Sequence, residues 1–219
     1  MITYKDIIKD EAINTYIKKA DESLLSLGYT EHSFAHVHKV ASDVEMILSS
    51  LGFSEHDIDI AKIAAHLHDI GNVVNRIDHS QSGAVMAFRI LDKLNMPPED
   101  IATIITAIGN HDEGTGVPVN PISAALILAD KSDVRRSRVR NASPSSFDIH
   151  DRVNYSVESS KLTVDVESKT ITLSIEIDTK ISPVMEYFEI FLERMLLCRK
   201  ASEALDMTFS LVINSQKLL

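Results

Sequence analysis

Hydrophobic residues recur every three or four positions through the first 140 residues of the chain, and turn-forming residues such as Gly52 and Gly71 separate the periodic stretches. This spacing places the apolar side chains along one face of an α-helix. The pattern therefore predicts that the first two thirds of the chain are nearly all helical. Helices are predicted at about 4–26, 32–50, 55–70, 79–93, 98–109 and 121–138.

The pattern changes after the polar stretch at residues 141–146. From Leu162 to Ile177, β-branched and aliphatic residues occupy alternate positions on both sides of a short polar turn. A strand that buries one face has this period of two. The segment is therefore predicted to form a β-hairpin.

A Ser-Pro pair then begins a predicted helix at about 183–205, and a last strand is predicted near 208–214. The sequence thus predicts an α+β protein, in which a helical domain at 1–140 is followed by a small ββαβ domain at 141–219. The edge of the hairpin and the apolar helix suggest that this second domain mediates dimerisation or covers a pocket.

The composition is that of a globular protein, because 44% of the 219 residues are hydrophobic and only 13 are Gly or Pro, 7 and 6 respectively. The formal net charge of −10 repels a phosphate backbone and argues against binding to a nucleic acid polymer. The single cysteine, Cys198, cannot form an intrachain disulfide. The N-terminus lacks the apolar core of a signal peptide, and the longest aliphatic run, Ala124–Ala129, is far shorter than the ~20 residues that cross a bilayer. A cytoplasmic protein without a membrane anchor is therefore expected.

The most informative polar feature is the pair His68-Asp69, which is followed by Gly71. Neighbours on a helix point about 100° apart, so both can reach one metal ion only where the helix ends. A glycine in the left-handed conformation would end the helix there. The alternative is that His68 is a hydrogen-bonded core residue and Asp69 a solvated residue at the helix end.

Further residues in the same order along the chain favour a metal site. His36 lies on a predicted helix 32 residues before His68, His79 begins another helix, His111 lies in a Gly-rich turn, and Asp130 ends the run ALILAD. With the contexts HDIG, HSQSGA and ADK, this arrangement resembles the HD-domain metal-dependent phosphohydrolase superfamily over roughly residues 30–135.

The resemblance implies a dinuclear centre in which the carboxylate of Asp69 bridges two divalent metal ions. Iron or manganese is expected, and zinc, nickel, cobalt and magnesium are compatible with the ligand types. The chain departs from related patterns at His32, where HD-GYP members often have Glu, at Asn110, where they have a second His, and at Asn72, where a Lys often follows HDIG. The ligands implied are His36, His68, Asp69, His79, His111 and Asp130.

The implied activity is hydrolysis of a phosphate ester. Two cations that share Asp69 and a bridging water would lower the pKa of that water and present hydroxide to phosphorus. Asp69 and His68 are the expected catalytic residues, and Asp112 is a candidate to support the site or transfer a proton. Five cations follow Asp130, and on a continuing helix three of them would share one side and bind phosphate, namely Lys131, Arg135 and Arg138. The alternative is that these cations form surface ion pairs.

The expected partner is a small phosphorylated metabolite or a nucleotide, and a homodimer could form through residues 141–219. A second hypothesis belongs to a different functional class: a nucleotide-sensing or scaffolding protein that keeps the metal site without turnover. Asn72 favours this alternative, as does the C-terminal segment, in which the sequence has no cluster of ligand-type residues.

Overall fold

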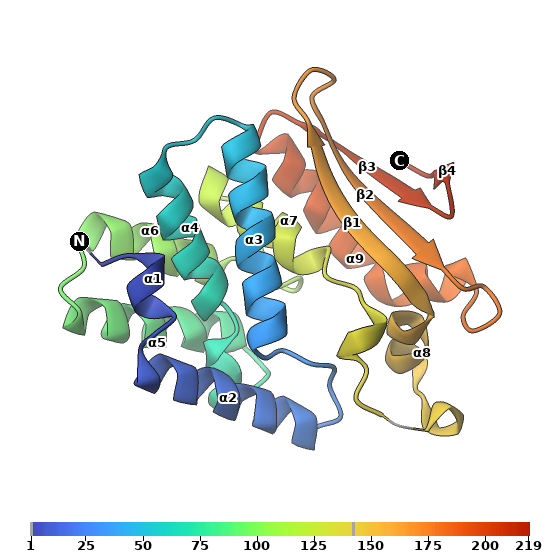
Figure 1. Cartoon of the computed structure of the whole chain (residues 1–219), viewed down its shortest axis with the longest axis horizontal. Helices are drawn as coiled ribbons and strands as arrows, with labels where there is room; N and C mark the ends of the chain where they lie inside the picture. Colours follow the sequence, from blue (N-terminus) through green and yellow to red (C-terminus); the bar gives the residue numbers. More distant parts are fainter. Residues whose placement is uncertain (1, 142) are drawn as a thin grey trace.

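The computed structural model describes residues 2–141 and 143–219, and it is built from a helical part that lies beside a small sheet (Figure 1). The helical part contains α1 (Tyr4–Ile7), α2 (Glu11–Ser26), α3 (Phe34–Ser50), α4 (Glu55–Leu67), the 3₁₀ helix η1 (Ile70–Val73), α5 (His79–Lys93), α6 (Pro98–Gly109) and α7 (Pro121–Lys131). The rest contains η2 (Arg136–Arg138), η3 (Pro144–Ser146), α8 (Ile149–Ser156), β1 (Val157–Asp165), β2 (Thr170–Ile177), α9 (Val184–Glu203), β3 (Thr208–Ile213) and β4 (Gln216–Lys217). The predicted α+β class is confirmed.

Polar capping residues set several of the helix boundaries. The side chain of Asp10 accepts hydrogen bonds from the backbone amides of Ala12 and Ile13, so a new helix begins at Glu11 and the predicted helix at 4–26 is divided in two. Asn120 and Ser123 form a reciprocal capping box at the start of α7. These caps satisfy amide groups that have no partner within their own helix.

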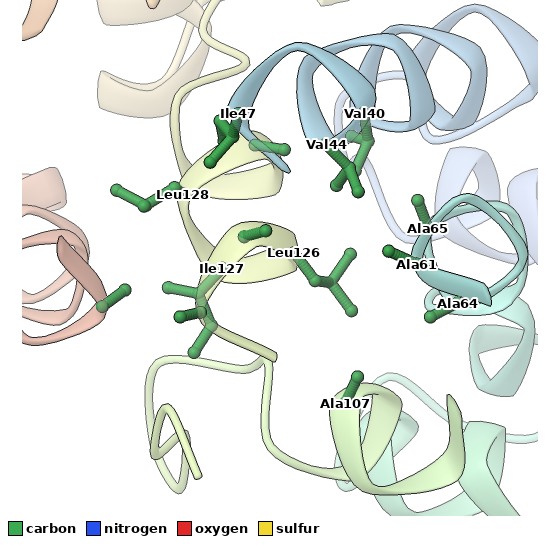
Figure 2. Packing of buried hydrophobic residues seen from close by; sticks show 14 of the residues in the cluster. Val40, Val44, Ile47, Ala61, Ala64, Ala65, Ala107, Leu126, Ile127 and Leu128 are labelled. Carbon is green, nitrogen blue, oxygen red and sulfur yellow. The ribbon is translucent and has the colours of Figure 1, made fainter. Parts of the chain in front are cut away.

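Helix α7 is the centre of the molecule, since every residue from Ile122 to Lys131 is buried. It packs against α3, α4 and α6 on one side and α9 on another. Figure 2 shows Leu126 of α7 pointing toward Val44 of α3 and Ala61 of α4, while Leu128 points to the other side of α7. A helix that is apolar on all sides must be enclosed by others, which explains the aliphatic run in its sequence.

The sheet has the strand order β1-β2-β3-β4. The predicted hairpin is present as the antiparallel pair β1 and β2, in which Leu162 lies opposite Leu173. Strands β2 and β3 are parallel, so the chain must cross over between them, and α9 provides this connection. Because α9 contacts both β3 and α7, it joins the sheet to the helical part.

Helix α8 and strand β4 of the C-terminal segment were among the elements not predicted from the sequence. Helix α8 is short and polar, and Asp148 caps it by accepting a hydrogen bond from the amide of Asp151. Strand β4 adds two residues to the sheet edge. Buried side chains from both parts of the chain form one hydrophobic cluster, and the division into two domains at residue 140 stays a prediction. Across the described residues, no helix combines the length and the apolar character that a membrane span requires.

Candidate metal centre

The six predicted ligands lie at the ends of helices that converge on one point. This arrangement lets residues far apart in the sequence meet at one buried point. They are His36 in the first turn of α3, His68 and Asp69 between α4 and η1, His79 at the start of α5, His111 just after α6 and Asp130 in the last turn of α7. All six are buried, with at most 8% of each residue exposed.

Four of these side chains form the first half of the cluster, and one of them, Asp69, is shared with the second half. Nε2 of His36 lies 3.3 Å from Nε2 of His68. Asp130 Oδ1 is 3.3 Å from the His36 nitrogen and 3.6 Å from the His68 nitrogen. Asp69 contributes Oδ2, at 3.3 Å from His68 Nε2 and 3.7 Å from His36 Nε2. Two imidazoles and two carboxylates therefore face one point.

The second half is built from His79 and His111, whose Nε2 atoms lie 3.2 Å apart. The other oxygen of Asp69, Oδ1, is 3.3 Å from His79 Nε2 and 3.9 Å from His111 Nε2. The two oxygens of one carboxylate thus point to two different histidine pairs, which is the position of a carboxylate that bridges two ions.

The hydrogen bonds of the four histidines fit a metal centre. Nδ1 of His68, His79 and His111 lies 2.7–3.1 Å from a backbone carbonyl, and Nδ1 of His36 lies 2.8 Å from Asp133 Oδ2. Because these partners are acceptors, Nδ1 of each ring is placed to hold a proton, and each ring in its neutral form directs an unshared electron pair from Nε2 into the cluster. Two such pairs facing one another at 3.2–3.3 Å repel unless a cation lies between them. The donor set therefore suits divalent transition metals.

The charges in the cluster also favour binding of a cation. Burial disfavours the charged form of His68, yet the carboxylates of Asp69 and Asp130 raise its pKa to about 10. On the other side, burial and the charge of Lys131 lower the pKa of His111 to about 3. The first half of the cluster therefore attracts positive charge more strongly than the second.

Gly71 has a different role from the one predicted. Its backbone is not left-handed; instead, a Cβ at this position would lie 2.0 Å from the carbonyl oxygen of His79 and 2.5 Å from the amide nitrogen of Gly83. The prediction of a left-handed cap is wrong because the glycine is needed for the close packing of η1 on α5. This contact holds His79 beside Asp69.

Asn72, which stands where a lysine was expected, supports the bridging carboxylate. Its side-chain amide donates hydrogen bonds to the backbone carbonyl of Asp69 at 2.9 Å and to Oδ1 of Asp69 at 3.0 Å. Asn72 is buried, so these bonds are shielded from water. The residue therefore orients Asp69 without adding charge.

The basic residues after Asp130 do not share one helix side, because α7 ends at Lys131. Lys131 is buried and paired with Asp130 Oδ2 at 2.7 Å and with Glu113 at 3.1 Å. Arg135 pairs with Asp133, whereas Arg138 donates to the backbone carbonyls of Glu31 and Asp133. The prediction of a common helical face is thus wrong; the alternative of surface ion pairs describes the partly exposed Arg135, whereas the ion pairs of Lys131 are buried. Their role as phosphate contacts stays a prediction.

Asp112 lies at the edge of the cluster, with Oδ1 3.9 Å from His79 Nε2 and 4.0 Å from Lys131 Nζ. The sequence interpretation missed Asp133, whose side chain is fully buried and holds His36 through Nδ1. Burial opposes its charge, but the hydrogen bond from His36 and the charge of Arg138 lower the pKa of Asp133. Its place three residues after Asp130 was the signal that could have identified it.

Replacing Asp133 by asparagine should weaken metal binding by about 10–100-fold, because partners that orient a ligating histidine typically contribute that much to affinity. The dissociation constant can be measured by competition with a chromophoric chelator. Asp92→Asn, on the exposed face of α5, is the control and should bind metal like the original protein. Equal affinities for the two variants would contradict the role assigned to Asp133.

Comparison with known proteins agrees with this geometry. A family model for the HD domain matches residues 33–137, a segment that includes all six clustered side chains. Over 179 residues the chain is 26% identical to an uncharacterised protein of Methanocaldococcus jannaschii, a match that covers 71% of this chain and 68% of that protein. It also resembles the crystal structure of a predicted HD superfamily hydrolase from an uncultured Thermotogales bacterium. That match has 24% identity and a TM-score of 0.45, and it covers 57% of this chain and 67% of the other. The resemblance noted over roughly residues 30–135 is confirmed: residues 33–137 match the HD domain.

Proposed function

We propose that this protein is a phosphohydrolase that cleaves a phosphate ester of a small metabolite or a nucleotide at a dinuclear metal centre. The observation that carries the proposal is the position of Asp69, whose Oδ2 and Oδ1 each lie 3.3 Å from a histidine of a different pair. A carboxylate so placed can bind two cations, and paired cations serve in-line displacement at phosphorus.

The two halves of the cluster would play unequal parts. His36, His68 and Asp130 would hold one ion and His79 and His111 the other, while Asp69 serves both. When bound, divalent ions supply positive charge to phosphoryl oxygens and lower the pKa of a water molecule. The second position has fewer protein donors, three against four, which leaves more room there for oxygens of the substrate.

The chain's own residues would keep this centre rigid. The fixed Nδ1 hydrogen bonds prevent the four imidazoles from turning, and Asn72 holds the carboxylate of Asp69. Lys131 neutralises the outer oxygen of Asp130, so that Oδ1 alone faces the histidines. Groups that are already oriented need no rearrangement when charge develops on the substrate.

Purified full-length protein should contain close to two transition-metal ions per chain and should hydrolyse 4-nitrophenyl phosphate or a nucleotide. Removing the ions with a chelator should abolish hydrolysis, and adding Mn²⁺ or Fe²⁺ should restore it. Elemental analysis and phosphate release measure the two quantities on the same sample.

One outcome would select the alternative function. A protein that retains both ions, binds a nucleotide saturably and hydrolyses no member of a broad panel of phosphate esters would be a sensor or scaffold. Buried ligands without ions, under conditions in which metal was supplied, would contradict both proposals.

A further inference from the structure

A cavity of about 370 Å³ lies against the metal cluster, outside the residues predicted as ligands. It is lined from both parts of the chain, by the α2–α3 connection, by Arg76 between η1 and α5, and by side chains of α8 and α9. Its link to the cluster is Arg76, whose Nη1 lies 3.3 Å from Nε2 of His79. The volume is in the range of small-molecule sites.

Three arginines line this cavity, and they differ in how fully they are paired. The guanidinium of Arg138 is occupied by the backbone carbonyls of Glu31 and Asp133. Arg194 on α9 pairs through Nε with Glu113, and within the described chain its two terminal nitrogens have no protein acceptor. Its side chain is 26% exposed, so those nitrogens remain available to a ligand.

Aromatic rings hold the two remaining guanidinium groups in place. Arg194 lies over the ring of Phe191, 4.4 Å from its centroid, and Arg76 lies over the ring of Tyr29, at 5.5 Å. Both rings also line the cavity. Stacking occupies the face of a guanidinium and leaves the N–H groups at its edge to bind phosphate. Nη1 of Arg76 already lies 3.4 Å from Asn72 Oδ1 and 3.3 Å from His79 Nε2, so Arg76 offers its remaining N–H groups.

The acidic residues near Arg194 do not cancel this positive charge. Glu113 pairs with Nε of Arg194 and also with Lys131, which is itself paired with Asp130, so Glu113 leaves the two terminal nitrogens of Arg194 unoccupied. Asp148 and Asp151 line the α8 side of the cavity, where Asp148 serves as the cap of α8 and Asp151 accepts a hydrogen bond from Asn141. Positive charge therefore lies beside the metal cluster, and negative charge lies at α8.

We propose that Arg194, together with Arg76, binds a second phosphate group of the substrate, so that preferred substrates carry one phosphate in addition to the phosphoryl group that is cleaved. This inference rests on the proposed function, since the first phosphate is the one held at the metal cluster. It assigns substrate selection to α9, a helix outside the HD domain.

Binding of non-hydrolysed or slowly hydrolysed probes tests this proposal. The Mn²⁺-loaded full-length protein is titrated calorimetrically with adenosine 5′-monophosphate, α,β-methylene adenosine 5′-diphosphate and adenosine 3′,5′-bisphosphate. At least one of the two-phosphate probes should bind at least about tenfold more tightly than the monophosphate. Each charge-assisted hydrogen bond is expected to raise the affinity by about this factor. Arg194→Gln should reduce this preference to about twofold or less.

The matched control is Arg199→Gln, on the exposed side of the same helix, which should keep the preference of the original protein. Arg194→Lys retains the charge without the two parallel N–H groups and should give an intermediate preference. The proposal is overturned if the original protein binds all three probes equally, or if folded Arg194→Gln keeps the preference. A protein that prefers two phosphates yet hydrolyses no phosphate ester would leave this proposal standing and remove only the proposed hydrolysis.

Discussion

Replacing Asp69 by alanine should remove both metal ions and lower kcat/KM for a phosphate ester by at least about 10³-fold. Asp69 is the one side chain that faces both histidine pairs, so its loss leaves each position without the shared carboxylate. The position at His79 and His111 would then have no carboxylate among its predicted ligands to offset a cation's desolvation, and the position at His36 and His68 would keep only Asp130. Elemental analysis and initial rates measure the two effects.

Two further variants separate charge from shape. Asp69→Asn keeps the size of the side chain and should lose metal nearly as completely as alanine, because the neutral amide cannot bridge two cations. Asp92→Asn removes an exposed carboxylate on α5 and should change neither metal content nor turnover. If Asp69→Ala kept two ions per chain and normal rates, the dinuclear assignment would be wrong.

Gly71→Ala should destabilise the protein by about 3 kcal/mol, although it adds a single methyl group. The new Cβ would meet backbone atoms of α5 at 2.0 Å and 2.5 Å, and a backbone cannot move aside as a flexible side chain can. Helix α5 must shift away from η1, which also carries His79 away from Asp69. Urea denaturation should show the loss of stability, and the ion at the His79 position should bind more weakly.

Gly114→Ala is the matched control for this prediction. A Cβ at Gly114 would have no atom within 4 Å, and its backbone does not require the left-handed region. Its stability should stay within about 0.5 kcal/mol of the original protein. Equal denaturation midpoints for the two alanine variants would show that α5 can move without cost and would refute the close-packing argument.

The ligand cluster could be predicted from the sequence because its chemistry is local and its order is distinctive. The His-Asp pair, the three other histidines and Asp130 stand in recognisable contexts and in a distinctive order along the chain. The alternation from Leu162 to Ile177 likewise predicted the hairpin, since the period of a strand is visible without knowledge of its partners. These features depend on neighbouring residues.

The parts that could not be predicted depend on contacts between distant segments. Helix α7 ends at Lys131, which pairs with Asp130 and Glu113, and the residues beyond it leave the helix. Arg194 is unremarkable in a polar position of α9 until the fold brings it beside the cavity. The lining of that cavity by α8 and α9 is what a pocket-covering role of residues 141–219 requires, while dimerisation through this segment stays a prediction.

The six predicted ligands come from different helices, and this affects the stability of the protein in a cell. They come from α3, α4, α5, α6 and α7 or from residues directly beside these helices, so each bound ion would act as a cross-link between segments that are separate in the chain. By mass action, an ion at a hundred times its dissociation constant adds about 2.7 kcal/mol to the free energy of unfolding. Protein made when metal is scarce would unfold more often, and proteases would degrade it sooner. The abundance of this protein would then follow the metal supply.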